Sequence, residues 1–201
     1  MYLSIDIGGT STRIGLSESL ESIAFVNTYS WQNTHDFETD LNQLHTQIKQ
    51  LNVPLQGIGL GIPGDVSHDK QTVLSTSWNQ EWEAVPIIEL LETAYSCPVY
   101  MDNDAVVAAL GVAYYDNIES SHFSYITWGT GIGGAHVSLT QRAVQATKLS
   151  WENYFESWEE KCGGKKIESR FHKKAEQLSD SEWKQVMHDF SQELHVFQEK
   201  T

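Results

Sequence analysis

Short runs of β-forming residues separated by small or polar turns dominate the start of the chain. Residues Tyr2 to Ile7 are mostly β-formers, and a Gly-Gly turn follows them. Ser11 to Leu16 and Ala24 to Thr28 have the composition of a second and a third strand. Strand-like runs joined by such turns are typical of hairpins. The pattern therefore predicts an opening β-meander.

The hydrophobic spacing then changes to a helical one, and strands and helices alternate. Apolar residues recur every three or four positions between Asp36 and Leu51, which predicts a helix with one buried stripe. The later predicted elements are a strand (57–62), a helix (86–95), a strand (98–101), a helix (105–115) and two strands (123–128 and 134–137). This alternation after a meander indicates an α/β fold.

The composition changes after about Leu139, where charged residues, Trp and Gly replace Val and Ile. We therefore expect two lobes, 1–138 and 139–201, the second partial and mainly helical. Ser179 and Glu182 have capping-box spacing and predict a final helix from about Asp180 to Gln198. One face of it is apolar: Trp183, Val186, Met187, Phe190, Leu194 and Phe197. This face must either fold back on the chain or find a partner. Because a large exposed apolar stripe is unusual in a soluble monomer, we expect self-association, for example as a homodimer.

Charge and cysteine content narrow the functional classes. Thirteen Lys and Arg against 27 Asp and Glu give a net charge of -14, which repels nucleic acids and anionic membranes. No run of apolar residues is long enough for a membrane span. Two cysteines, Cys97 and Cys162, are too few for a disulfide framework or a four-cysteine zinc site. These features predict a cytoplasmic protein that binds neither nucleic acid nor membrane.

The first candidate site is the segment from Asp6 to Arg13, between two predicted strands. Gly8 and Gly9 would let backbone amides approach a phosphate, while Thr10 adds a hydroxyl donor and Arg13 a positive charge. Asp6 could hold Mg²⁺ through water, because Mg²⁺ prefers oxygen ligands and keeps much of its hydration shell. An ordinary Gly-Gly hairpin is the alternative interpretation.

A second glycine cluster follows the strand that begins at Phe123. Gly129, Thr130, Gly131 and Gly133 form another candidate phosphate loop, and a tight hairpin is again the alternative. Two such loops, each after a β-strand, favour a paired phosphate site over two unrelated turns.

Between these loops, the segment 102–105 ends a short strand just before a helix. Its carboxylates could simply cap the helix. Phosphoryl transfer to a hydroxyl, however, needs a carboxylate within reach of the attacking oxygen. Asp104 could be that general base, with Asn103 as a neighbouring amide that holds the acceptor.

Four motifs together carry a resemblance to a known family: Asp-Ile-Gly-Gly-Thr (6–10), Gly-Ile-Pro-Gly (61–64), Asp-Asn-Asp-Ala (102–105) and Gly-Thr-Gly-Ile-Gly-Gly (129–134). In this order and spacing they resemble the ROK (repressor, ORF, kinase) family of sugar kinases and bacterial glucokinases. The resemblance implies an actin-like ATPase (ribonuclease H-like) fold with an incomplete second lobe. It also implies ATP and Mg²⁺ as cofactors and a hexose or related sugar as substrate.

The resemblance assigns roles to individual residues. It implies that the two glycine loops bind the nucleotide phosphates, that Asn103 binds sugar hydroxyls and that Asp104 is the general base. Gly61 and Pro63 would border the sugar. A later segment, 158–164, resembles the family's Trp-Glu-Ala-Tyr-Ala-Ser-Gly, so Glu159 would also bind the sugar.

The chain also departs from the family pattern. Gln145 and Lys148 stand where many members have the Glu and His of a sugar-binding Glu-x-Gly-His sequence, and the Cys-rich zinc loop is missing. We therefore expect no zinc site. The family usually continues for about another third of its chain, so the activity of this short chain is in doubt.

Three functions stay open: a working sugar kinase, a catalytically weak sugar- or nucleotide-binding relative, and a transcriptional regulator. Asp104 favours the kinase, whereas Gln145 and Lys148 favour the weak relative. The regulator is least favoured, because such proteins place a helix-turn-helix before the phosphate motif and this chain is strongly acidic.

Overall fold

The computed structural model describes residues 1–8, 11–19, 21–23, 25–30, 36–76, 79–116, 118–140 and 143–201. The chain forms two compact units, 1–108 and 109–201. The expected lobe boundary at 138/139 stays a prediction, while strand residues before 139 share a hydrophobic core with the helices that follow them. Each unit is described by itself.

The first unit is built on a five-stranded sheet in the order β3-β2-β1-β4-β7. Its strands are β1 (Tyr2–Ile7), β2 (Ser11–Ser17), β3 (Phe25–Ser30), β4 (Gly57–Ile62) and β7 (Val99–Asn103). The first three strands are antiparallel neighbours, which confirms the predicted meander, whereas β4 and β7 run parallel to β1. The carboxyl ends of β1, β4 and β7 therefore meet at one edge of the sheet.

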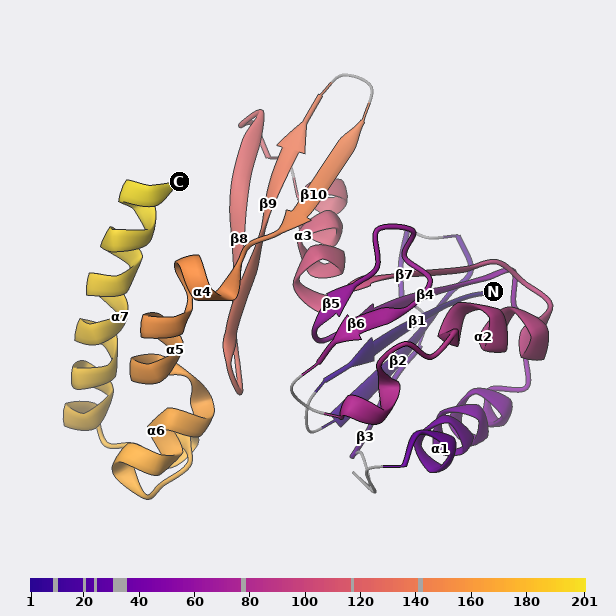
Figure 1. Ribbon diagram of the computed structural model, residues 1–201, viewed down its shortest axis with the longest axis horizontal. Coiled ribbons are helices and arrows are strands. Elements are labelled where there is room, and N and C mark those ends of the chain that lie inside the picture. The colour runs from indigo at the N-terminus through magenta and orange to yellow at the C-terminus, as the bar shows by residue number, and fades with distance from the viewer. Residues whose placement is uncertain are drawn as a thin grey trace. The chain divides into compact units, whose positions relative to one another are not determined.

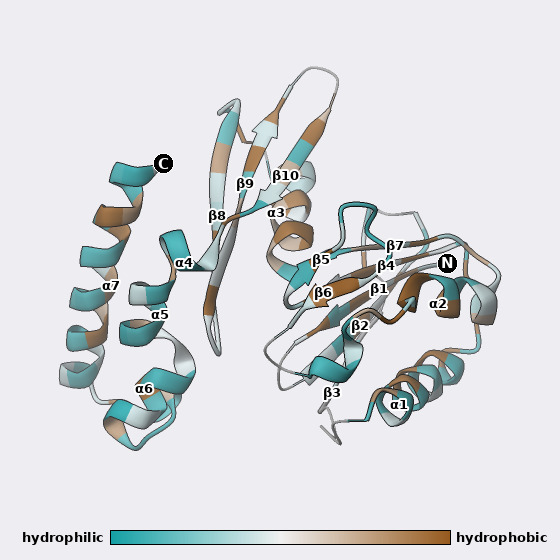
Figure 2. Ribbon diagram, in the orientation of Figure 1, coloured by the Kyte–Doolittle hydropathy of each residue, from teal (hydrophilic) through white to brown (hydrophobic). Residues whose placement is uncertain are grey.

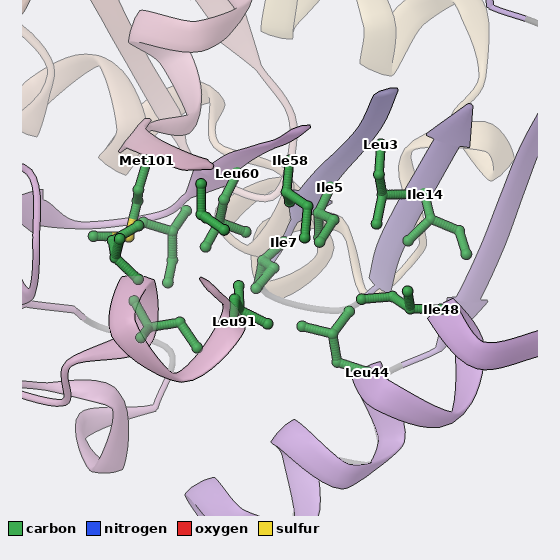
Figure 3. Close-up of a cluster of buried hydrophobic side chains, with 14 of the residues drawn as sticks. Leu3, Ile5, Ile7, Ile14, Leu44, Ile48, Ile58, Leu60, Leu91 and Met101 are labelled. Carbon is green, nitrogen blue, oxygen red and sulfur yellow. The ribbon is translucent and has the colours of Figure 1, made fainter. Parts of the chain in front are cut away.

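Two helices cover one face of this sheet, α1 (Phe37–Gln50) and α2 (Ile87–Tyr95) (Figure 1). Figure 3 shows the core between the sheet and these two helices, where Ile5 and Ile7 of β1 face Leu44 of α1 and Leu91 of α2. All four side chains are buried. Because alternate residues of a strand point to opposite faces, Ser4 and Asp6 of β1 lie on the other face of the sheet.

Smaller elements complete the first unit. A hairpin of β5 (Asp65–Val66) and β6 (Val73–Ser75) follows β4, and a 3-10 helix (Gln80–Trp82) leads toward α2. The helix α3 (Asp104–Tyr115) starts directly at the end of β7 and continues across the division at residue 108.

The second unit combines a three-stranded antiparallel sheet, in the order β10-β9-β8, with helices. Its elements are β8 (His122–Trp128), β9 (Ile132–Leu139), β10 (Val144–Lys148), α4 (Trp151–Tyr154), α5 (Glu156–Cys162), α6 (Gly164–Phe171), a 3-10 helix (Ala175–Gln177) and α7 (Asp180–Lys200). Phe155 and Trp158 are fully buried at the centre of its core, beside Ile132 of β9.

The last helix begins as expected, but its apolar face is not exposed. Ser179 and Glu182 form the predicted capping box of α7. Val186 and Phe197 are buried, and Figure 2 shows hydrophobic residues interspersed along this otherwise hydrophilic helix. Of the two expected outcomes, this face folds back: α7 packs on α5 and the aromatic core, and only Met187 of the six residues is prominently exposed, at 47%. A homodimer stays a prediction, without this argument for it.

None of the helices among the described residues is both long enough and apolar enough to cross a lipid bilayer.

Candidate functional site

A row of polar residues crosses the first unit at the carboxyl ends of its parallel strands. Asp6 of β1 is in register with Gly61 of β4, and Gly61 is in register with Asp102 of β7. Residues in register share a face of the sheet, and two strands separate the carboxylates by about 10 Å at the backbone. Ligand sites of α/β proteins commonly lie at this edge.

The first turn of α3 packs over the middle of this row. A Cβ atom on Gly61 would lie 3.5 Å from the Cα atom of Asp104 and 3.7 Å from the Cβ atom of Val107. The absence of a side chain at Gly61 thus lets α3 approach the sheet closely. As a result, the backbone of Asp104 lies above the centre of the row, between Asp6 and Asp102.

An ion pair lies on each side of Asp104. The guanidinium of Arg13 donates to Asp6 Oδ2 at 2.9 Å, and the ammonium of Lys70 donates to Asp102 Oδ1 at 2.9 Å. The side chains of Arg13 and Asp6 are 61% and 49% exposed, so their mutual attraction contributes little to stability. Both remain accessible to a ligand, as the expected phosphate and Mg²⁺ roles require.

The turn after Asp6 is only partly described. The Gly8 amide donates to the Ser11 carbonyl at 2.8 Å, which closes a tight turn between β1 and β2. Gly9 and Thr10, both expected to contact phosphate, lie outside the described residues. The exposed carboxylate of Asp6 fits a Mg²⁺ ion bound through water, since Mg²⁺ keeps several waters and takes few protein carboxylates in nucleotide sites.

Asn103 is buried and joins three segments. Its Oδ1 atom accepts the amides of Ala105 at 3.0 Å and Val106 at 3.4 Å, and its Nδ2 atom donates to the Gly64 carbonyl at 2.9 Å. The side chain therefore caps α3 and ties it to the turn after β4. Its expected contact with sugar hydroxyls stays a prediction.

Asp104 is the first residue of α3 and is half-buried. Its Oδ1 atom accepts the Ala105 amide at 2.9 Å. Pro63, expected to border the sugar together with Gly61, lies in the turn between β4 and β5 and is also half-buried. The first unit thus brings Asp6, Arg13, Gly61, Asn103 and Asp104 to one edge of the sheet.

The second unit holds the other glycine loop between β8 and β9. The Gly129 amide donates to the Gly131 carbonyl at 2.9 Å, which closes a tight turn, and the expected contact with phosphate stays a prediction. The loop is also fixed from outside, because the amides of Gly164 and Lys165, at the start of α6, donate to the carbonyls of Gly129 and Thr130. Gly133 follows in β9, in register with Thr127.

Glu159 of α5 lies against this loop. Its Oε2 atom accepts the Ile132 amide at 2.7 Å, and a Cβ atom on Gly131 would lie only 2.3 Å from the same oxygen. Gly131 is therefore required for this contact. The expected binding of sugar by Glu159 stays a prediction, and the contact with the glycine loop was not foreseen from the sequence.

Gln145 and Lys148 lie on β10, in register with Ser138 and Ala135 of β9. Because they are three residues apart in a strand, they belong to opposite faces of the sheet. Among the residues that the structure describes, no three His, Cys, Asp or Glu side chains form a cluster that could hold a metal ion.

Comparison with known proteins assigns the family. The model of the ROK family matches residues 2–146 of this chain. The chain belongs to the ROK family. Its described architecture is that of the actin-like ATPase fold, which its structural neighbours share.

The similar ROK proteins include both enzymes and regulators. The chain is 29% identical over 149 residues to the glucokinase of Halalkalibacterium halodurans, covering 68% of this chain and 44% of that protein. It is also 29% identical over 139 residues to the xylose repressor of Caldicellulosiruptor bescii, covering 65% and 35%. The chain thus spans less than half of these relatives, and identity alone does not separate the two functions.

Among solved structures, the inorganic polyphosphate/ATP-glucomannokinase of Arthrobacter sp. strain KM superposes with a TM-score of 0.76 at 22% identity. This likeness covers 98% of this chain and 79% of that one, and it shows the fold.

Proposed function

We propose that this chain provides the phosphate- and sugar-binding residues of an ATP-dependent kinase for a hexose or related sugar. The observation that carries the proposal is the polar edge of the first unit, where Asp104 lies between the Arg13–Asp6 and Lys70–Asp102 ion pairs. The similarity to a glucokinase and to an ATP-glucomannokinase supports the choice of reaction.

In this proposal, Asp104 accepts the proton of the attacking sugar hydroxyl at its carboxylate. Such proton transfer by a positioned side chain contributes about 10² to 10⁴ in rate. Asn103 fixes the first turn of α3 and so holds the base in place. Arg13 and the turn that starts at Gly8 would contact phosphate, and Asp6 would hold Mg²⁺ through water. Bound MgATP supplies the phosphoryl group and neutralises part of its charge.

The decisive variant is Asp104→Asn. Asn is as good a capping residue as Asp but cannot accept the proton, so turnover should fall about 10²- to 10⁴-fold. Sugar affinity, measured by calorimetry, should stay within a few-fold. Asp116→Asn, which removes a carboxylate just beyond the other end of α3, is the matched control. Turnover of Asp104→Asn at the parent rate would mean that Asp104 only caps the helix.

A second candidate function is sugar binding without transfer. It is favoured by the similarity to a xylose repressor and by Gln145 and Lys148 at the positions of the family's Glu and His. Two measurements over a panel that includes glucose, mannose and xylose separate the two functions. A coupled assay measures turnover, and calorimetry measures binding. Binding of a sugar without turnover supports the second function, and turnover supports the first.

A further inference from the structure

The tip of the β5–β6 hairpin is built around two side chains, Ser67 and Asp69. The Ser67 hydroxyl donates to Asp69 Oδ1 at 2.6 Å and accepts the amides of Gln71 at 3.1 Å and Thr72 at 3.0 Å. The Lys70 amide donates to the Ser67 carbonyl at 2.9 Å. These bonds hold Lys70 in a left-handed backbone conformation, with φ at 60°, that a residue other than Gly rarely adopts.

From this tip, the Lys70 side chain reaches the end of β7. Its ammonium lies 2.9 Å from Asp102 Oδ1, and the same oxygen accepts the Asn103 amide at 2.8 Å. The two charged side chains are 47% and 21% exposed, and 32 residues separate them in the sequence. The tip is therefore tied to the residue two positions before the proposed general base.

The base of the same hairpin is tied to the next residue. Asn103 Nδ2 donates to the carbonyl of Gly64, in the turn that enters the hairpin. Gly64 has a φ of 118°, and a Cβ atom there would lie 2.2 Å from the Ser75 carbonyl oxygen, so the turn requires Gly. Asp102 and Asn103 thus hold both ends of the hairpin beside Asp104.

We propose that Lys70 is a positioning residue for the sugar, because its ion pair with Asp102 holds the β5–β6 hairpin as a fixed wall beside Asp104. This inference rests on the proposed function. Strands of two and three residues are marginal on their own, so the hairpin depends on its outside contacts. An exposed ion pair adds little to global stability, so its loss should loosen the hairpin without unfolding the protein.

The test compares Lys70→Met, Asp102→Asn and the double variant. Lys70→Met should raise the KM for the sugar about two- to fivefold, which corresponds to the usual free energy of an exposed ion pair. Both kcat and the KM for ATP should stay unchanged. The double variant should bind sugar no worse than Asp102→Asn alone, since the partner is already lost. Lys70→Arg keeps the positive charge and should therefore have the same sugar KM as the parent. Lys49→Met, which removes an exposed charge at the end of α1, is the control.

Hydrogen exchange supplies a readout that does not depend on turnover. Lys70→Met should increase exchange at residues 67–72, while the unfolding midpoint of the protein stays the same. Unchanged exchange at these residues, or an unchanged sugar KM, overturns the inference. Additive effects in the double variant also overturn it.

The proposed function can fail separately from the inference. A parent chain that neither binds nor phosphorylates any sugar of the panel rejects the proposed function, and with it the sugar-positioning role. The exchange data would then still decide whether the ion pair holds the hairpin.

Discussion

A buried carboxylate on α1 offers the sharpest test of how the first unit is held together. Asp40 is completely buried, and its Oδ2 atom accepts Asn79 Nδ2 at 2.8 Å and Trp82 Nε1 at 3.3 Å. Its Oδ1 atom has no hydrogen-bond partner among the residues that the structure describes. Burial raises the pKa of nearby Tyr29 to about 12, and the charge of Asp40 adds to this rise. We infer that Asp40 holds the segment before α2 in place.

Asp40→Ala should destabilise the first unit substantially. It removes the carboxylate that accepts from Asn79 and Trp82, and the loss of an acceptor for a buried donor costs about 1–3 kcal/mol. The loss is partly offset, because a buried negative charge with one unpartnered oxygen is also removed. The expected cost is therefore about 2–4 kcal/mol, which corresponds to a decrease of about 1–2 M in the urea midpoint.

Asp40→Asn separates the hydrogen bonds from the charge. The amide oxygen can accept both donors and the buried charge is removed, but the amide nitrogen brings N–H groups that would have no acceptor among the described residues. We expect a cost of about 1–2 kcal/mol, less than that of Asp40→Ala. Trp82→Phe removes one of the two donors, so it should cost less in the Asp40→Ala background than in the parent.

Urea unfolding followed by circular dichroism, with fluorescence as a second probe, measures these differences. A cost below about 1 kcal/mol for Asp40→Ala would refute the reasoning, because the loss of a carboxylate that accepts from two buried donors should cost more. Equal losses for Asp40→Ala and Asp40→Asn would instead assign the effect to the charge.

Two further predictions concern the second unit. Gly131→Ala should displace the Glu159 carboxylate from the Ile132 amide and lower stability by about 1.5–3 kcal/mol in thermal unfolding, the usual worth of a hydrogen bond to a charged group. Glu182 should make stability depend on acid pH, because the Ser179 amide, with further hydrogen bonds, lowers its pKa from 4.5 to about 2. This contribution is present above pH 4.5 and is lost as the pH falls toward 2, so Glu182→Gln should flatten the dependence in that range.

Both predictions have matched controls. A Cβ atom on Gly129 would meet nothing within 4 Å, so Gly129→Ala should leave stability within about 0.5 kcal/mol of the parent. Glu199→Gln changes an exposed acid at the other end of α7 and should leave the acid dependence intact. Equal effects of the two glycine substitutions would mean that displacement of Glu159 is not the cause.

The elements with strong local patterns could be predicted from the sequence. The opening strands, α1, α3 and the capped start of α7 all follow from spacing and capping residues within a few positions of one another. The β5–β6 hairpin could not be predicted, because strands of two and three residues show no periodicity. The burial of the apolar face of α7 depends on its packing against α5. No local sequence pattern specifies that packing.

The same distinction applies to the candidate site. The glycine loops and the 102–105 segment were visible as motifs, because each is contiguous. Lys70, beside the candidate site, was missed because its partner is 32 residues away, and Asp40, in the interior of the first unit, was missed because its partners are 39 and 42 residues away. One signal did exist for Asp40: it lies three residues after Phe37 and four before Leu44, on the apolar stripe of its helix.

The segment Asp102-Asn103-Asp104 shows why neighbouring polar residues need not be interchangeable. Asp102 pairs with Lys70, and position 103 needs an acceptor for two amides together with a donor to the Gly64 carbonyl, which an amide side chain offers and a carboxylate does not. Because Asn103 already accepts the amides of Ala105 and Val106, the start of α3 is capped without Asp104. This weakens the interpretation of Asp104 as a helix cap and favours a chemical role. Asp104→Ala, which removes any capping oxygen, should accordingly keep its unfolding midpoint while it loses turnover, whereas a marked loss of stability would mean that Asp104 caps α3.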